Sequence, residues 1–171
     1  SPNKKKGYQN GMLLSQGKVV SGVGGGLCQM SNLLYWLVLH TNLEVIERHH
    51  HSLDVFKDSG RTVPFGTGAT IFFPTLDLRF RNNSNHSVIL NVYLTETQLV
   101  GKLLAQEKES TYKYHIYDSH NEYYKYKGTF YRFNKVHREK ILHGKVEETA
   151  LLYENLFPTL YTPDNFVQIN T

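Results

Sequence analysis

The residues best suited to chemistry lie near the start of the chain, where a glycine cluster runs into the only cysteine. Gly24, Gly25 and Gly26 precede Cys28, and an apolar segment follows. Glycines let a backbone approach a ligand closely, and a helix that begins after them points free N–H groups at the thiol. That arrangement favours a thiolate, the nucleophilic and metal-binding form of cysteine. The same pattern also fits a loop followed by a helix that buries a small apolar thiol.

A histidine cluster follows far enough along the chain for a helix to fold back onto it. His49, His50 and His51 are consecutive, and period-two alternation along a strand puts His49 and His51 on one face. Acyl transfer by a cysteine needs a thiolate, a base and donors for the oxyanion. We therefore predict Cys28 as the nucleophile and His49 as the preferred base, with His51 as the alternative. We interpret His50 as a solvated or hydrogen-bonded strand residue.

Several neighbours of these residues could complete such a site. Backbone N–H groups at Gly25 and Gly26, or the Gln29 side chain, could hold the oxyanion. Asp77 could orient the base, and Glu47 is the alternative because it shares the strand face of the histidines. A structural role for Asp77 fits the sequence equally well.

Arginines near these segments are candidate substrate-binding residues. Arg48 adjoins the histidines, and Arg79 and Arg81 could hold a peptide carboxylate through two parallel hydrogen bonds. The plain structural interpretation is that all three are exposed or pair with Glu47 and Asp77.

Metal binding is the rival chemistry for the same side chains. Cys28, His49 and His51 could be three zinc ligands, with water as the fourth. The glycine-rich approach and the neighbouring glutamine fit a nucleophile better, so we predict no cofactor and keep zinc as the alternative.

Composition limits the kinds of protein this chain can be. It has 171 residues, of which 40% are hydrophobic and 20% charged, so we expect a folded chain of about one domain. The net charge of +4 is weak, and the lysines and arginines are scattered along the chain, so the sequence does not indicate a nucleic-acid partner. A weakly basic surface would equally suit an anionic polymer such as a cell wall. One cysteine excludes an internal disulfide.

The sequence contains no segment that we expect to cross a membrane. The apolar run at residues 33–39 is too short to span a bilayer, and the first residues do not form a signal peptide. The chain also begins without Met, so we expect a portion upstream of it. The compartment therefore stays open between the cell envelope and the cytoplasm.

Apolar periodicity predicts one helix among many strands. Spacings of three and four predict a helix over residues 32–41, apolar nearly all round and therefore buried. A hairpin over residues 11–21 turns at Gln16 and Gly17, and a strand is predicted over residues 44–51. Further strands are predicted over residues 69–73, 76–81, 88–95 and 98–105, followed by a β-meander from residue 111 and an extended tail from residue 158.

The predicted fold class is α+β. We expect one central buried helix carrying the cysteine at its N-terminus, packed on a mostly antiparallel sheet, with a β-rich C-terminal part. Residues 1–105 would form the core with the cysteine loop and the histidine strand, and residues 106–171 a β-rich extension of the same domain.

Three blocks of the sequence resemble the VanW family, the bacterial family named after an accessory protein of B-type vancomycin-resistance clusters. The blocks are residues 24–35 (GGGLCQMSNLLY), 47–52 (ERHHHS) and 76–82 (LDLRFRN). With the intervening residues 61–70 (RTVPFGTGAT) the resemblance covers roughly residues 7–105, and residues 131–134 (YRFN) look like the short members of the family.

The resemblance implies work on the bacterial wall. Some exported members of the family are understood as cysteine-dependent L,D-transpeptidases that cross-link peptidoglycan stem peptides. For this chain it implies cysteine-dependent acyl transfer on peptidoglycan or its precursors, linked to glycopeptide resistance. A non-catalytic module that binds wall precursors and a zinc-dependent hydrolase are the alternatives.

Overall fold

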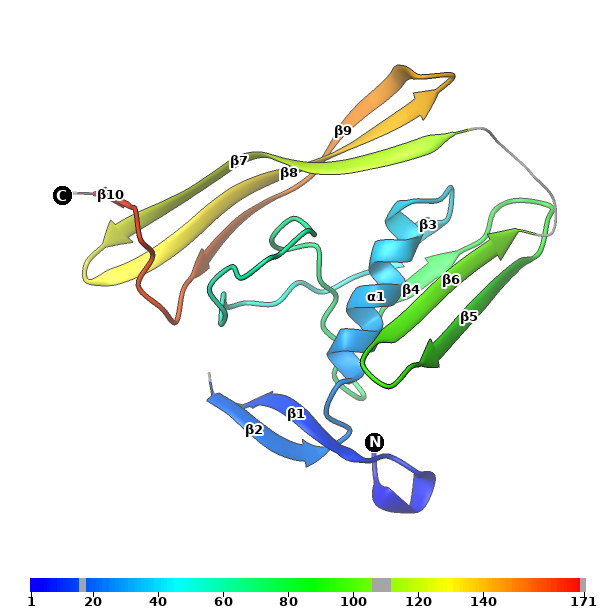
Figure 1. The fold of residues 1–171 in the computed structure, drawn as a ribbon, viewed down its shortest axis with the longest axis horizontal. Coiled ribbons are helices and arrows are strands. Elements are labelled where there is room, and N and C mark those ends of the chain that lie inside the picture. The colour runs from blue at the N-terminus through cyan, green and yellow to red at the C-terminus, as the bar shows by residue number, and fades with distance from the viewer. Residues whose placement is uncertain (16–17, 106–111, 170–171) are drawn as a thin grey trace.

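The fold consists of one α-helix, a short 3-10 turn and ten strands, among the residues that the structure describes. The computed structural model describes residues 1–15, 18–105 and 112–169 (Figure 1). The helical elements are η1 (Lys4–Lys6) and α1 (Leu27–Leu39). The strands are β1 (Asn10–Ser15), β2 (Lys18–Val23), β3 (Glu44–Glu47), β4 (Arg79–Arg81), β5 (Val88–Leu94), β6 (Leu99–Ala105), β7 (Lys113–Tyr126), β8 (Thr129–Leu142), β9 (Lys145–Pro158) and β10 (Val167–Gln168).

The strands form four separate sheets. Three are two-stranded antiparallel pairs: β1 with β2, β3 with β4, and β5 with β6. The fourth has the order β10-β7-β8-β9, in which the three long strands are antiparallel and β10 runs parallel to β7. This long sheet lies along one side of the molecule, and the β1–β2 hairpin projects from the other (Figure 1).

The prediction of an α+β fold is wrong, because strands dominate the structure. The described residues are 51% strand and 10% helix, so the fold is mostly β. The physical reason lies in the C-terminal part, where β7, β8 and β9 each run for 14 residues. Alternating aromatic and polar residues suit such strands, since one face packs and the other stays solvated. The helix therefore stands among several small sheets and does not lie at the centre of one.

The helix begins earlier than its apolar periodicity predicted. Residues 32–41 were expected, but α1 starts at Leu27 and includes Cys28 in its first turn. Gly26 precedes it with φ +89°, in the left-handed region that favours glycine, and supplies no side-chain cap. Without a Ser, Thr, Asp or Asn cap, the sequence carries no usual signal for this start.

The core joins the helix to the long sheet through one loop residue. Tyr35 and Leu39 of α1 pack with Ala69, and with Ile116 and Val136 from β7 and β8. Burial of such side chains stabilises a fold by about 1.5–3 kcal/mol for each large one. The core thus lies between α1 and the long sheet, with the segment around Ala69 enclosed between them.

Some of the predicted strands are confirmed by the structure, and others are shorter than predicted or absent from the described residues. The hairpin over residues 11–21 is confirmed by the antiparallel pairing of β1 with β2, although its turn lies outside the described residues. The predicted strand over residues 44–51 ends at Glu47, and its register shifts between Val45 and Glu47. Residues 69–73 form only isolated bridges. No helix within the described ranges is long and apolar enough to cross a membrane.

Candidate functional site around Cys28

Cys28 lies in the first turn of α1. The glycine loop that precedes this turn is hydrogen-bonded to the β1–β2 hairpin. Backbone N–H groups of Gly24 and Gly26 donate to the carbonyls of Gln9 (2.9 Å) and Met12 (3.1 Å). The thiol is partly buried, and its Sγ donates to the carbonyl of Ile71 at 3.8 Å. The glycine cluster therefore fixes the start of the helix, and with it the position of the thiol.

One face of α1 carries a row of polar atoms that bind the segment 68–71. The Ser31 hydroxyl donates to the carbonyl of Ala69 at 2.5 Å, and the N–H of Ala69 donates to Asn32 Oδ1 at 2.7 Å. Together with Cys28, these residues lie at positions i, i+3 and i+4 of the helix, which share one face. Gly68 has no room for a side chain, because a Cβ there would lie 2.9 Å from Asn32 Oδ1.

His51 reaches the same face. Its Nε2 makes a long hydrogen bond of 3.4 Å to Asn32 Oδ1, and its Nδ1 lies 2.8 Å from the Thr70 hydroxyl. The amide oxygen of Asn32 accepts from Ala69 and can only accept, so Nε2 carries the proton and Nδ1 accepts from Thr70. Burial, with smaller contributions from Arg48 and His50, lowers the pKa of His51. The ring is therefore neutral at neutral pH.

His49 belongs to a different cluster. Its Nε2 lies 2.9 Å from Glu47 Oε1, which also accepts from the backbone N–H of Asp77 at 3.2 Å. Arg79 approaches the other oxygen of Glu47 at 3.6 Å. The hydrogen bond from His49 is the largest cause that lowers the pKa of Glu47. The Asp77 carboxylate accepts from the N–H of Leu78 and does not orient a histidine.

Arg48 is enclosed by aromatic rings and backbone carbonyls. Its guanidinium lies 5.1 Å from the ring centre of Tyr35 and 4.7 Å from that of Tyr153. It donates to the carbonyl of Gly68 at 2.8 Å and to that of Gly66. Its donors are thus directed at the loop that passes α1, which is a structural use of a residue predicted to bind substrate.

The structure brings some of the predicted residues together and separates others. Cys28 and His51 both contact the segment 68–71, but among the described residues the thiol hydrogen-bonds only to Ile71 and to no histidine. His49 turns toward Glu47, and Gln29 is exposed. No group of three or more His, Cys, Asp or Glu side chains is placed to hold a metal ion in the part of the chain that the structure describes. Cys28 and His49 thus have different hydrogen-bond partners and are not placed together as the zinc alternative requires.

Three residues of this site were not singled out from the sequence. Ser31 and Asn32 are polar residues one turn after Cys28 in an otherwise apolar helix, and that position was the available signal. Thr70 gave no signal of its own, because only folding places its hydroxyl against His51.

Comparison with known proteins decides the family. The sequence model described as "VanW like protein" matches residues 1–104, which is more than half of the chain. The chain belongs to the VanW family. The resemblance predicted from the three blocks is thereby confirmed.

Two curated relatives are longer than this chain. It is 31% identical over 169 residues to the vancomycin B-type resistance protein VanW of Enterococcus faecalis, a match that covers 98% of this chain and 61% of that protein. It is 32% identical over 87 residues to the uncharacterized protein YoaR of Bacillus subtilis, covering 51% of this chain and 27% of that protein. The chain thus spans less than two thirds of either relative. No solved structure matches it significantly.

A second polar cluster anchors the loop that leads to the segment 68–71 beside Cys28. Arg132 of β8 is almost fully buried and donates to Asp54, Asp58 and Asn121. Asp54 is also buried and accepts from the Tyr161 hydroxyl at 2.6 Å. Beside Arg132 lies a polar cavity of about 320 Å³. The cluster fixes the start of the loop whose later residues, 66–71, contact Arg48 and α1.

Proposed function

We propose that this chain transfers acyl groups of peptidoglycan stem peptides through a thioester at Cys28, as a member of a family linked by name to vancomycin resistance. The observation that carries the proposal is the approach of Cys28 and His51 to the same segment, through Ile71 and Thr70 respectively. The family membership and the name of the Enterococcus faecalis relative support a wall substrate.

In the proposed reaction, Cys28 is the nucleophile and His51 is the general base and then the general acid. The Cys28 sulfur attacks the carbonyl carbon of a stem peptide, and its proton passes to Nδ1 of His51, the ring nitrogen that carries no proton. The Thr70 hydroxyl, which donates to Nδ1, must first turn away. Collapse of the tetrahedral intermediate breaks the C–N bond, and His51 returns the proton to the leaving amine. An acceptor amine, or water, then attacks the thioester and restores the thiol. The oxyanion is assigned to the N–H groups of Leu27 and Cys28 at the start of α1. The predicted donors Gly25 and Gly26 are already used, because their N–H groups donate to the carbonyls of Gly22 and Met12.

His51 replaces His49 as the base in this proposal. His51 contacts Asn32, one helical turn from Cys28, whereas His49 is held by Glu47. Its lowered pKa keeps it in the form that accepts a proton. The Cys28 side chain must leave the carbonyl of Ile71 to react, since that contact occupies the thiol hydrogen.

The test is trapping of the thioester. A muropeptide with an intact stem is incubated with the chain, and the intact protein mass is measured. We expect a mass increase equal to the acyl fragment, mapped to Cys28 by peptide analysis and absent in Cys28→Ala. His51→Gln should reduce the rate by about 10²–10⁴-fold, the usual worth of general acid–base catalysis, while His49→Gln should change it little. An adduct that persists in Cys28→Ala would contradict the proposal.

A non-catalytic module for wall precursors is the second candidate, favoured by the hydrogen bond of the thiol to Ile71. A thiol held by a carbonyl is a packing contact, and the same surface could bind a stem peptide without reacting. Titration calorimetry with the same muropeptide separates the two functions. Equal affinity in the wild type and Cys28→Ala, with no adduct in either, would establish binding alone.

A further inference from the structure

The β1–β2 hairpin exposes an apolar surface that the proposed acyl transfer does not use. Directly paired residues share a face of the hairpin, so Met12, Leu14 and Val19 lie together. Their exposures are 62%, 48% and 49%, and Val20 on the other face is 41% exposed. The hairpin projects from the body of the molecule, with η1 near one of its ends (Figure 1).

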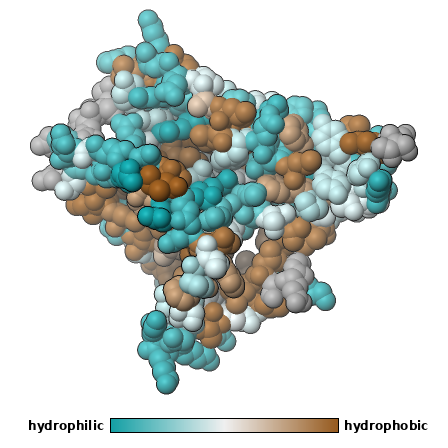
Figure 2. All heavy atoms as spheres, turned by 180° about the vertical axis from the view of Figure 1, so that it is seen from behind, coloured by the Kyte–Doolittle hydropathy of each residue, from teal (hydrophilic) through white to brown (hydrophobic). Residues whose placement is uncertain are grey.

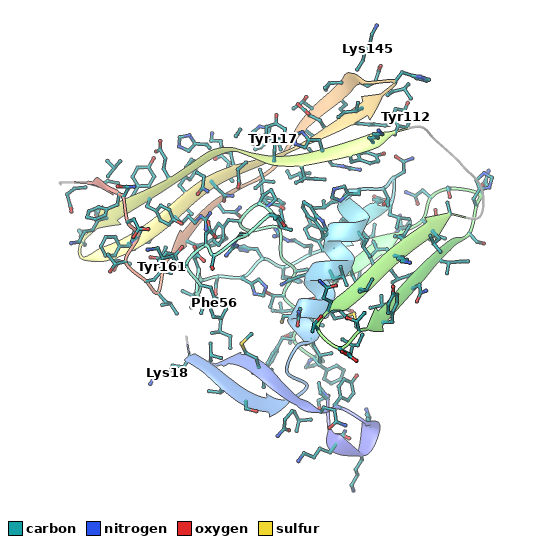
Figure 3. All side chains as sticks on the ribbon, in the orientation of Figure 1. Lys18, Phe56, Tyr112, Tyr117, Lys145 and Tyr161 are labelled. Carbon is teal, nitrogen blue, oxygen red and sulfur yellow. The ribbon has the colours of Figure 1, made fainter. Side chains whose placement is uncertain are left out.

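Positive charge flanks this apolar surface at both ends. Lys4, Lys5 and Lys6 form η1 and are exposed, and Lys18 begins β2 next to the tip. Figure 3 shows Lys18 pointing away from the body of the molecule. Viewed from behind, brown apolar atoms are exposed among paler ones in the lower part of the molecule, above the teal atoms at its lowest end (Figure 2).

The net positive charge of the whole chain comes from its first 43 residues. Residues 1–43 contain four lysines and no arginine, aspartate or glutamate. Residues 44–171 contain the other 15 basic and all 15 acidic side chains, so they are balanced. The net charge of +4 therefore belongs entirely to the segment that carries η1, the hairpin and α1.

We propose that the β1–β2 hairpin docks the protein on a membrane surface that contains anionic lipid. Apolar side chains flanked by lysines are the pattern of segments that lie in the interface, where the apolar groups enter the acyl boundary and the lysines meet the headgroups. A second copy of the chain fits this surface less well, because a symmetric contact would bring two sets of lysines together with no acidic partner.

Docking in this way would orient the site. The hairpin is bonded to the glycine loop through Met12 and Gly26, and Gly11 and Gly25 pack so closely that a Cβ on Gly25 would lie 2.0 Å from the Gly11 carbonyl carbon. The hairpin is therefore held directly against the start of α1. On a bilayer, the end of α1 that bears Cys28 would face the lipid surface. The proposal does not depend on Cys28 reacting, so Cys28→Ala should bind vesicles as the wild type does.

The test is co-sedimentation of the chain with phosphatidylcholine vesicles, with and without phosphatidylglycerol. We expect binding to the mixed vesicles only, weakening as salt rises from about 0.1 to about 1 M and the screening length falls from about 10 to about 3 Å. The variant Lys4→Gln/Lys5→Gln/Lys6→Gln should lose about fivefold in affinity per lysine, or about a hundredfold in total. The matched control is Lys102→Gln/Lys113→Gln/Lys145→Gln, which removes the same charge from exposed positions on other strands and should lose far less.

The apolar part is tested by Met12→Ser/Leu14→Ser, which should lose at least tenfold in affinity. Ile89→Ser/Leu104→Ser is its control, because those residues pair on another two-stranded hairpin with exposures of 58% and 49%. Circular dichroism must show that all variants keep the fold.

Four results would overturn the proposal. They are failure to bind the mixed vesicles, equal binding to neutral vesicles, equal losses in a variant and its control, and self-association in solution that Met12→Ser/Leu14→Ser abolishes. The last would assign the surface to a second copy of the chain.

Discussion

Removing the guanidinium of Arg132 should destabilise the protein strongly, because it leaves a buried carboxylate without its cation. Arg132 is 1% exposed and Asp54 2% exposed, and their closest N–O distance is 3.3 Å. Breaking a buried pair by removing one partner costs about 3–5 kcal/mol. Asp58 adds less, since its side chain is 38% exposed and Arg61 lies 2.7 Å from it. We therefore expect Arg132→Met to lower the free energy of unfolding by about 3–5 kcal/mol, a large part of a typical total of about 5–15.

Urea denaturation followed by circular dichroism measures this loss, and a second substitution tests its cause. If the cost comes from the unpaired charge, Asp54→Asn in the Arg132→Met background should recover at least half of it, because a neutral amide at that position is cheaper to bury. The free energy of unfolding of Arg132→Lys should lie between those of the wild type and Arg132→Met. A single ammonium keeps the charge but cannot reproduce the fork that binds Asp54, Asp58 and Asn121 at once.

Two results would refute this reasoning. One is Arg132→Met within about 1 kcal/mol of the wild type at an unchanged denaturant slope, which would mean that the pair barely exceeds its desolvation cost. The other is a double variant no more stable than Arg132→Met alone. In that case the loss would come from packing of the arginine against Phe65, whose ring centre lies 4.3 Å from the guanidinium.

Three further predictions concern residues around Cys28 and the segment 66–71. Arg48→Lys should lower the thermal midpoint by several degrees and speed amide exchange near Gly68, because a lysine cannot stack between two rings while donating to two carbonyls. The pKa of His51 is lowered in the folded protein, so near and below the ordinary value of 6.5 the unfolded chain binds more protons than the folded one. The free energy of unfolding should therefore fall as the pH falls from about 6.5. In urea titrations between pH 7.5 and 5.5, His51→Gln should reduce this dependence on pH. The lowered pKa of Glu47 acts only below its ordinary value of 4.5 and leaves that window unaffected. Gly25→Ala should destabilise by about 1–3 kcal/mol and speed the reaction of Cys28 with a thiol reagent, since its Cβ forces the hairpin off the glycine loop.

Local patterns predicted the elements whose determinants lie close together in sequence. The hairpin formed where two apolar runs flank a Gln-Gly pair, and the helix formed where apolar residues recur every three or four positions. The start of the helix was missed because Gly26 begins it through its backbone conformation, without a capping side chain. The strand through the histidines was wrong because a register shift after Val45 breaks the alternation on which their shared face depended.

Contacts between distant residues could not be predicted in this way. Arg132 meets Asp54 across 78 positions and Asp58 across 74, and nothing in the flanking residues of either partner indicates the pairing. Asn32 likewise meets His51 only after the chain has folded. The fold class failed for the same reason, since the break-up of the strands into four sheets depends on which strands find partners.

The interior of this chain uses arginine to hold loops, and that limits where a substrate can bind. Arg48 donates to two carbonyls of the segment 54–68. Arg132 donates to two carboxylates of the same segment and to Asn121 of β7, so both charges are used within the protein. The helix face that follows Cys28 is likewise committed to residues 68–71. In the proposed acyl transfer, the open approach to Cys28 is from the start of α1, which is the side from which the hairpin projects (Figure 1). The two proposals therefore converge on one end of the molecule, and a substrate presented at a membrane surface would reach the thiol without reorienting the protein.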